Sequence, residues 1–473
     1  MPQVERRAPR GADGAGHRPV CGEVRRGAVA LAFLAALTLA PARPAAAATL
    51  RAGAATGAFS IPDGTPLAGY GSVRRRLLFP DLLGRHPHAF WFKPHAGDLD
   101  PVAARALVLE TPSARLAWVS VDLIAVDRAF TRAVERRLED GIGPATVLVS
   151  ASHTHSGPGA FVESRLMGWI ALDSLDATVR GALVETVVAT IERAAAAAVE
   201  ARVAATSVSV PGVTKSRLAK ALDPELVALR ITSASGAPIA LVWNFAIHGT
   251  VLGARNLRLS GDVMGVASRE LERDLGIPVL FVNGAVGDVS PAAHGEAALA
   301  RLAPELARAA RAAWDHAGPR ESPGLAIRRA RVALPPPRLS VRNCAGWWVP
   351  ASVTVPLGRA LPQDAELTAV ALGGTAWVTI PGELQAALGL EIKREARALF
   401  RHAFVAGVSN DYLGYFVTAE DYSRPAYVTC ATVYGPRAGE CLATTAAELL
   451  RGLAGRSRPA TTGARACDGT SDR

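Results

Sequence analysis

Three histidines and one glutamate in this sequence are residue types that hold catalytic metal ions. His153 and His155 lie two residues apart after an apolar run, and His248 ends a second one. Glu383 stands just before a helical pattern. Each signal alone has an ordinary explanation, since histidines near apolar runs are commonly core residues and a first-turn carboxylate favours the helix dipole. Together they predict a metal centre, because catalytic zinc sites combine histidines with a carboxylate and leave a position for water.

Four predicted strands end in polar, glycine-bearing loops that contain these residues. The strands cover 146–150, 239–247, 278–282 and 376–380. In layered α/β proteins, polar groups at the carboxyl ends of strands converge on one crevice. An extended backbone at 153–155 would direct both imidazoles to the same side. We therefore expect the four loops to share one site.

The remaining pattern alternates strands with helices. Residues 104–127 predict a β-hairpin around a turn at 111–113. Helical patterns cover 129–139, 177–199, 265–275, 304–317 and 385–400. This alternation predicts an α/β fold.

Length and composition indicate a folded globular protein. The chain has 473 residues, 49% of them hydrophobic, enough for a sizeable core. Of the net charge of +10, residues 1–48 contribute +4 and the rest +6. This modest excess suits peripheral contact with an anionic membrane surface or an acidic substrate. The chain has no Lys/Arg stripe with interleaved aromatics, which argues against nucleic-acid binding.

The first residues have the layout of a signal peptide. Six arginines precede an apolar run at 28–40, and four alanines follow at 45–48. The run is too short to span a bilayer as a helix. We therefore expect a signal peptide at 1–47, a catalytic domain at 48–455 and a flexible tail at 456–473, in a secreted or periplasmic protein.

Four cysteines remain after the expected cleavage. They are Cys344, Cys430, Cys441 and Cys467. An even count predicts two disulfides in an oxidising compartment. Three pairings are available, and the short loop favours Cys430 with Cys441. No C-x-x-C spacing supports a cysteine-ligated zinc site.

Five ordered motifs resemble the neutral, non-lysosomal ceramidase family. They are 152–159 (SHTHSGPG), 244–250 (NFAIHGT) with 259–262 (LSGD), 283–291 (NGAVGDVSP), 381–384 (PGEL), and 410–436 from NDYLGY to YGP. The opening at 66–71 (PLAGYG) is also similar, so the resemblance runs from about residue 53 to residue 436.

The resemblance implies an α/β fold of layered, mixed β-sheets flanked by helices, forming a single catalytic domain. It also implies a zinc ion held by four side chains. These are His153, His248, Glu383 and Tyr415, with His155 beside the ion as the group that takes and returns a proton. Zinc lowers the pKa of bound water and polarises an amide carbonyl. Without the family match, Tyr415 would be interpreted as an ordinary packed aromatic residue.

Three further residues are implied by the resemblance. Ser290, in the family's GDVSP segment, is either a nucleophile or a substrate-positioning residue, and both roles stay open. Tyr422 and Tyr427 are expected to line the substrate pocket and to donate to a developing oxyanion. Arg217 lies near the position of a family arginine, but the match is loose and we do not place it in the site.

The implied reaction is hydrolysis of the N-acyl bond of ceramide to sphingosine and a fatty acid. The region 291–381 looks shorter than in the family, Ala292 replaces an asparagine, and Val428 replaces an acidic residue. We therefore expect a lipid or N-acyl amine substrate without assigning it to ceramide alone. The departures leave open a zinc-dependent amidase or esterase acting on another acylated substrate that is smaller or more polar. A non-catalytic exported binding protein with the same fold is the remaining alternative.

Overall fold

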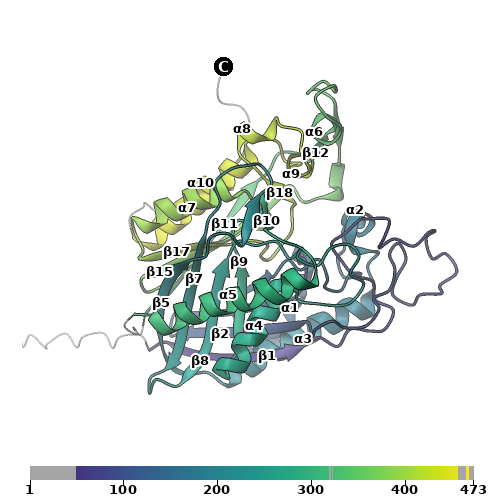
Figure 1. Ribbon diagram of the computed structural model, residues 1–473. Coiled ribbons are helices and arrows are strands. Elements are labelled where there is room, and N and C mark those ends of the chain that lie inside the picture. Colours follow the sequence, from purple (N-terminus) through teal and green to yellow (C-terminus); the bar gives the residue numbers. More distant parts are fainter. Residues whose placement is uncertain (1–48, 319–320, 322, 456–464, 468–473) are drawn as a thin grey trace, which may run out of the picture. The chain divides into compact units, whose positions relative to one another are not determined.

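The computed structural model describes residues 49–318, 321, 323–455 and 465–467 (Figure 1). The expected signal peptide therefore lies outside the described residues, as does most of the expected tail. The α-helices of five or more residues are α1 (Arg128–Ile142), α3 (Ala177–Ala196), α4 (Asp262–Leu275), α5 (Glu296–His316), α6 (Val341–Ala345), α7 (Ala386–Arg397) and α10 (Ala438–Leu453). Three shorter helices are α2 (Arg165–Met167), α8 (Ala419–Tyr422) and α9 (Tyr427–Cys430).

The larger of the two main sheets has eight strands in the order β4-β3-β2-β1-β5-β7-β8-β9. They are β1 (Arg51–Ala58), β2 (Ala103–Thr111), β3 (Ala114–Val121), β4 (Thr146–Ala151), β5 (Val199–Ser209), β7 (Glu225–Ser233), β8 (Pro238–Phe245) and β9 (Val279–Asn283). Most neighbours are antiparallel, but β3–β4 and β8–β9 are parallel. The expected hairpin is present as β2 and β3, although β3 ends at Val121.

The second sheet has the order β17-β15-β14-β11-β19. Its strands are β11 (Leu325–Ala333), β14 (Asp364–Leu372), β15 (Thr375–Thr379), β17 (His402–Ala406) and β19 (Arg465–Ala466). Three two-stranded pairs complete the fold: β6 (Thr214–Ser216) with β10 (Val289–Pro291), β12 (Arg338–Ser340) with β13 (Thr354–Pro356), and β16 (Glu383–Leu384) with β18 (Tyr415–Phe416).

The two sheets pack face to face between layers of helices. Helices α1, α3, α4 and α5 cover the outer face of the first sheet, and α7 with α10 cover the second (Figure 1). Between the sheets, the buried rings of Trp118 and Trp377 stack with centroids 4.8 Å apart. Truncating either ring to alanine would cost about 3–5 kcal/mol. The expected fold class, layered mixed sheets flanked by helices, is confirmed.

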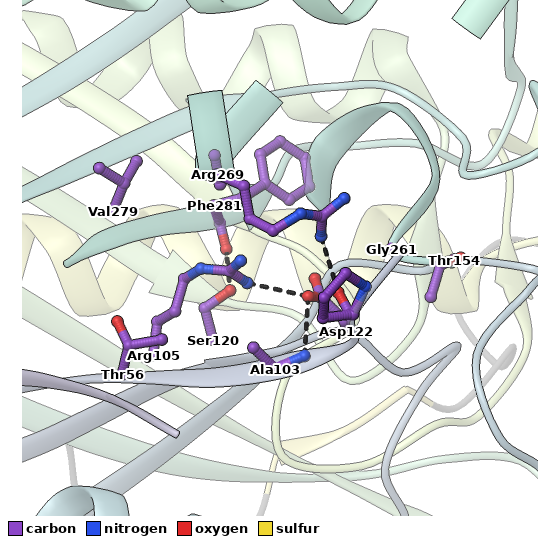
Figure 2. Close-up of polar contacts among 12 residues, drawn as sticks. Thr56, Ala103, Arg105, Ser120, Asp122, Thr154, Gly261, Arg269, Val279 and Phe281 are labelled. Atoms are coloured by element: carbon purple, nitrogen blue, oxygen red, sulfur yellow. Dashed lines mark hydrogen bonds and ion pairs between the residues drawn. The ribbon is translucent and has the colours of Figure 1, made fainter. Parts of the chain in front are cut away.

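The first sheet curls, so its two ends approach each other. Ser120 in β3 donates a hydrogen bond to the carbonyl oxygen of Phe281 in β9 (2.5 Å; Figure 2). The side-chain amide of Asn283, at the end of β9, donates to the carbonyl oxygens of Ser152 (3.1 Å) and Ile247 (3.0 Å). The loops after β4, β8 and β9 therefore meet, although β4 and β9 stand at opposite ends of the strand order.

A buried charge network braces this closure. Arg105 in β2 contacts the carboxylate of Asp122 after β3 (2.9 Å) and that of Glu272 in α4 (2.9 Å; the Asp122 contact is drawn in Figure 2). The Asp122 carboxylate also accepts the backbone N–H of Ala103 (3.0 Å). Removing one partner would leave a buried charge unpaired, at a cost of about 3–5 kcal/mol. The network fixes β2, β3 and α4 next to the loop that contains His153.

Helix α5 begins eight residues before the expected start at 304 and contains Pro304. Its buried apolar stripe, which includes Leu299, Leu302 and Leu306, continues past the proline. Packing of this stripe therefore outweighs the hydrogen bond that proline removes. Helix α7 occupies most of the expected segment 385–400.

The cysteines form two disulfides, as expected, but the favoured pairing of Cys430 with Cys441 is wrong. The observed bonds are Cys344–Cys430 and Cys441–Cys467. Cys430 ends α9, which packs on α6, whereas Cys441 lies in the first turn of α10. Within the expected flexible tail, Arg465–Ala466 form β19 beside β11, and the bonded Cys467 follows them. Within the described ranges, no helix is both long and apolar enough to cross a membrane.

Candidate active site

The structure brings His153 and His248 into contact. Their Nε2 atoms are 3.1 Å apart, and both side chains are buried. The two loops run side by side, since Thr154 pairs with Gly249 in a parallel bridge and the N–H of His155 donates to the Gly249 carbonyl oxygen (2.8 Å). A Cβ at Gly249 would lie 2.4 Å from the His153 carbonyl oxygen, so glycine is required for this approach.

The backbone at His153 is left-handed, with φ of 68°, so the expected extended conformation is wrong. The chain turns here because the N–H of His153 donates to the Leu123 carbonyl oxygen (3.0 Å) and its ring Nδ1 binds the Ile124 carbonyl oxygen (2.6 Å). His155 is nevertheless close, with its ring centroid 5.0 Å from that of His153 and 5.4 Å from that of His248.

Glu383 reaches the histidines from the second half of the chain. Its strand, β16, pairs in parallel with β18, which places Glu383 opposite Tyr415. Its Oε1 lies 3.3 Å from Nε2 of His153, and its Oε2 lies 3.3 Å from Nε2 of His248. The four loops do converge, but the loop after β15 comes from the second sheet and not from a neighbouring strand of the first.

The ring nitrogens of His153 and His248 and the carboxylate oxygens of Glu383 are arranged as the ligands of a metal ion would be. The carbonyl oxygen of Ile124 can only accept, so Nδ1 of His153 carries the proton and its Nε2 presents a lone pair. The separations of 3.1 to 3.3 Å among the imidazole and carboxylate atoms match the roughly 3.3 Å between two ligands of a tetrahedral ion bound at about 2.0 Å. Ring nitrogens of His153, His155 and His248 all lie within 4.8 Å of one another. This buried cluster could hold a metal.

Tyr415, the expected fourth ligand, is buried beside the cluster. Burial, and then the negative charge of Glu383, raises the pKa of Tyr415 well above its usual value. The Tyr415 hydroxyl accepts a hydrogen bond from Nη1 of Arg217 (3.3 Å). Tyr427 packs edge-on against the Tyr415 ring with centroids 5.8 Å apart, and Tyr422 packs in the same small apolar cluster.

Arg217, which the sequence analysis left outside the site, lies within it. It follows β6, whose pairing with β10 places Ser290 opposite Lys215. Nε of Arg217 donates to Oγ of Ser290 (2.8 Å), so one guanidinium joins Ser290 to Tyr415. Strands of three residues give little sequence signal, and the loosely matched arginine of the family was the only indication.

Tyr412 and Tyr70 are further members of the site that the sequence analysis missed. The Tyr412 hydroxyl donates to Oε1 of Glu383 (2.5 Å). Its position three residues before Tyr415 in the NDYLGY motif was the available signal. The Tyr70 ring lies 4.9 Å from the ring of His155. A Cβ at the adjacent Gly69, where φ is 104°, would lie 2.7 Å from Cγ of His155.

The electrostatic environment keeps His155 neutral. Burial, followed by the neighbouring imidazole of His153 and the charge of Arg217, lowers the pKa of His155 well below its ordinary value. Within the described residues, neither ring nitrogen of His155 makes a hydrogen bond of normal geometry. Burial, then Arg217, lowers the pKa of His248 in the same way. Neutral imidazoles are the form that binds metals and accepts protons.

Fold and site together define an α/β protein with a buried histidine and carboxylate centre suited to a metal ion. Residues 97–300 match the family model described as "Neutral/alkaline non-lysosomal ceramidase, N-terminal". The resemblance that the motifs predict, to the neutral ceramidase family, is therefore confirmed.

Two relatives and one solved structure extend the comparison. The chain is 24% identical to a neutral ceramidase of Pseudomonas aeruginosa, over 70% of this chain and 64% of that protein. It is also 24% identical to a neutral ceramidase of Mycobacterium tuberculosis, over 78% and 74% of the two chains. The crystal structure of neutral ceramidase from P. aeruginosa superimposes with a TM-score of 0.75 and 19% identity, covering 88% of this chain and 76% of that one. The sequence match covers slightly less than two thirds of the length of the Pseudomonas relative.

Proposed function

We propose that this chain is a zinc-dependent amidohydrolase that cleaves the N-acyl bond of ceramide to give sphingosine and a fatty acid. The observation that carries the proposal is the meeting of His153, His248 and Glu383 at 3.1 to 3.3 Å. Two relatives to which this chain is similar are named neutral ceramidases. We infer that the catalytic domain covers 48–455 and acts outside the cytoplasm, which agrees with its two disulfides.

In this proposal His153, His248, Glu383 and Tyr415 hold the ion. A bound zinc ion supplies an acidic water and a polarised carbonyl. His155 takes the proton from the attacking water and delivers it to the leaving amine nitrogen, a role that fits its close but unbonded ring nitrogens.

The remaining side chains position the substrate. Arg217 is a fixed cation within the site, and Tyr427 packs on Tyr415, so both can donate to the oxygen that becomes negatively charged. Tyr422 packs in the same apolar cluster as Tyr415 and is proposed to line the same side of the substrate pocket. Ser290 accepts a hydrogen bond from Arg217, and a guanidinium cannot take a proton from serine. Of the two roles that were open for Ser290, this contact favours positioning over nucleophilic attack.

Metal content and turnover of variants test these roles. His153→Ala, His248→Ala and Glu383→Ala should each lower zinc per chain, whereas His155→Ala should keep zinc and lose hydrolysis. His294→Ala, which changes a histidine bound to the Thr250 carbonyl oxygen, is the control and should keep both. An empty site in His155→Ala would refute the division of roles.

A cleft beside the site favours a second candidate, an amidase or esterase with an acidic acylated substrate. The cleft measures about 830 Å³ and is bordered by Tyr412, by five arginines and by the acids Asp127, Glu163 and Asp411. Arg128 and Arg180 form ion pairs with these acids, and the other arginines are Arg132, Arg136 and Arg359. Arginines recognise carboxylates better than alkyl chains. Comparing hydrolysis of ceramide with that of N-acyl substrates ending in a carboxylate decides between the two. If the zinc-loaded protein cleaves neither ceramide nor these N-acyl substrates, the remaining hypothesis is a non-catalytic binding protein.

A further inference from the structure

Large apolar side chains are exposed on three segments, which we call the apolar rim. Its members are Val73, Leu78, Phe79, Leu82, Leu83, Trp169, Ile170, Leu175, Trp347, Trp348, Val353 and Val355. Leu78 is 90% exposed and Trp348 is 78% exposed. Elsewhere in the described part of the chain, only Val199 and Tyr427 are exposed to a similar degree. Soluble proteins normally scatter such residues singly, so this concentration marks an interaction surface.

The three segments of the rim are physically linked. The Arg76 guanidinium donates to the carbonyl oxygens of Trp169 and Ile170 and lies 5.4 Å from the centre of the Trp169 ring. Ser164, just before α2, donates to the carbonyl oxygen of Ala360 (3.3 Å), which follows the third segment. In Figure 1, the loop between β1 and β2 and the region of α6 and β12 both project beyond the sheets on the side where α2 lies.

The rim is also fixed to the candidate active site. Tyr70, three residues before Val73, packs on His155. Cys344, three residues before Trp347, is bonded to Cys430, the last residue of the helix that begins at Tyr427. The side chain of Tyr427 is 69% exposed, so the site reaches the surface beside the rim.

Two of the three rim segments are basic, whereas the third, residues 163–176, has Arg165 against Glu163, Asp173 and Asp176. Residues 72–95 contain four arginines and one lysine against the single acid Asp81, and residues 338–360 contain three arginines and no acid. Arg74, Arg85, Lys93 and Arg359 are exposed. Exposed Leu, Phe and Trp among cations are typical of proteins that lie on an anionic lipid surface. A second copy of the chain would bring the same cations face to face, which disfavours self-association.

We propose that the apolar rim docks on the surface of an anionic lipid bilayer. Leu78, Phe79 and Trp348 enter the interface while the surrounding arginines and lysine contact lipid headgroups. Docking rests on exposure and charge and does not depend on the proposed reaction. It adds to that reaction a route by which a lipid substrate reaches the site directly from the membrane.

Vesicle binding by the full chain tests the proposal. The wild type should sediment with vesicles of phosphatidylcholine and phosphatidylglycerol, bind vesicles of phosphatidylcholine alone at least about tenfold more weakly, and lose binding as salt rises. Phe79→Ser and Trp348→Ser should each weaken binding about tenfold or more. Val199→Ser, at an exposed apolar residue outside the rim, should bind like the wild type.

Three results would overturn docking. The wild type could fail to bind the anionic vesicles, the two rim variants could bind as well as Val199→Ser, or they could change only the oligomeric state in size-exclusion chromatography, which would identify a second copy as the partner. Hydrolysis of a short, water-soluble N-acyl substrate should be the same in wild type and rim variants. If the wild type binds vesicles in the predicted pattern but hydrolyses nothing, the proposed reaction fails and docking stands.

Discussion

Tyr412→Phe is the substitution that most sharply isolates a support of the candidate metal centre. It removes only the hydroxyl that donates to Oε1 of Glu383 (2.5 Å) and keeps the aromatic ring. Burial, and then the charge of Glu383, raises the pKa of Tyr412 well above its usual value, so the hydroxyl keeps its proton and remains a donor. The same Glu383 oxygen lies 3.3 Å from Nε2 of His153.

The expected loss follows from the kind of hydrogen bond that is removed. A hydrogen bond to a buried carboxylate contributes about 1.5–3 kcal/mol. If this energy serves to orient Glu383 toward the metal, the zinc dissociation constant should rise about 10- to 100-fold. The loss should appear in metal affinity first, because no ligand is deleted.

Competition with a chromophoric chelator measures that dissociation constant directly. Tyr434→Phe is the matched control, since its hydroxyl donates to the Pro362 carbonyl oxygen (2.7 Å) away from the site. The control should lose some stability, about 1 kcal/mol, and keep wild-type zinc affinity. Equal zinc affinity in wild type and Tyr412→Phe would refute the role of Tyr412 in orienting Glu383.

Three further substitutions test other parts of the site and fold. Ser290→Ala should lower kcat by about tenfold and keep zinc, as expected for a positioning residue, whereas a loss above about 10⁴-fold would make it the nucleophile. Gly69→Ala would place a Cβ 2.7 Å from His155 and should reduce turnover more than zinc content. Unchanged turnover would show that the loop of Gly69 shifts to make room for the added methyl group. Burial raises the pKa of Glu225, but the charge of Lys393, 2.6 Å away, contributes to a net lowering of that pKa. A lowered carboxylate pKa stabilises the folded state, and this stabilisation is lost as pH falls through the folded-state pKa. In urea unfolding, Lys393→Met should therefore cost about 3 kcal/mol near neutral pH and less once the pH falls below the ordinary glutamate value of 4.5. A pH-independent difference would contradict this reasoning.

Local patterns predicted the elements that carry the site. The strand expected at 146–150 is β4, and the helix expected at 385–400 is mostly α7. The polar loops next to the predicted strands contain His153, His155, His248 and Glu383. These features follow from side-chain periodicity and turn residues, which act over short distances along the chain.

Features that depend on long-range pairing could not be predicted in the same way. Arg217 enters the site through the three-residue pair β6–β10, and the disulfide partners depend on how α9 and α10 pack. The left-handed backbone of His153 is imposed by carbonyl groups of the 123–124 segment. In each case the structure depends on a contact between residues far apart in sequence. The sequence around either residue alone does not predict that contact.

Titration of metal-free protein with zinc tests the central claim most directly. The metal should be removed with a strong chelator, and fatty acid release from ceramide should be followed as zinc is added back. We predict no release at the start and a linear rise that ends at about one zinc per chain, the capacity of a single site. Full hydrolysis by the metal-free protein would contradict the role assigned to His153, His248 and Glu383.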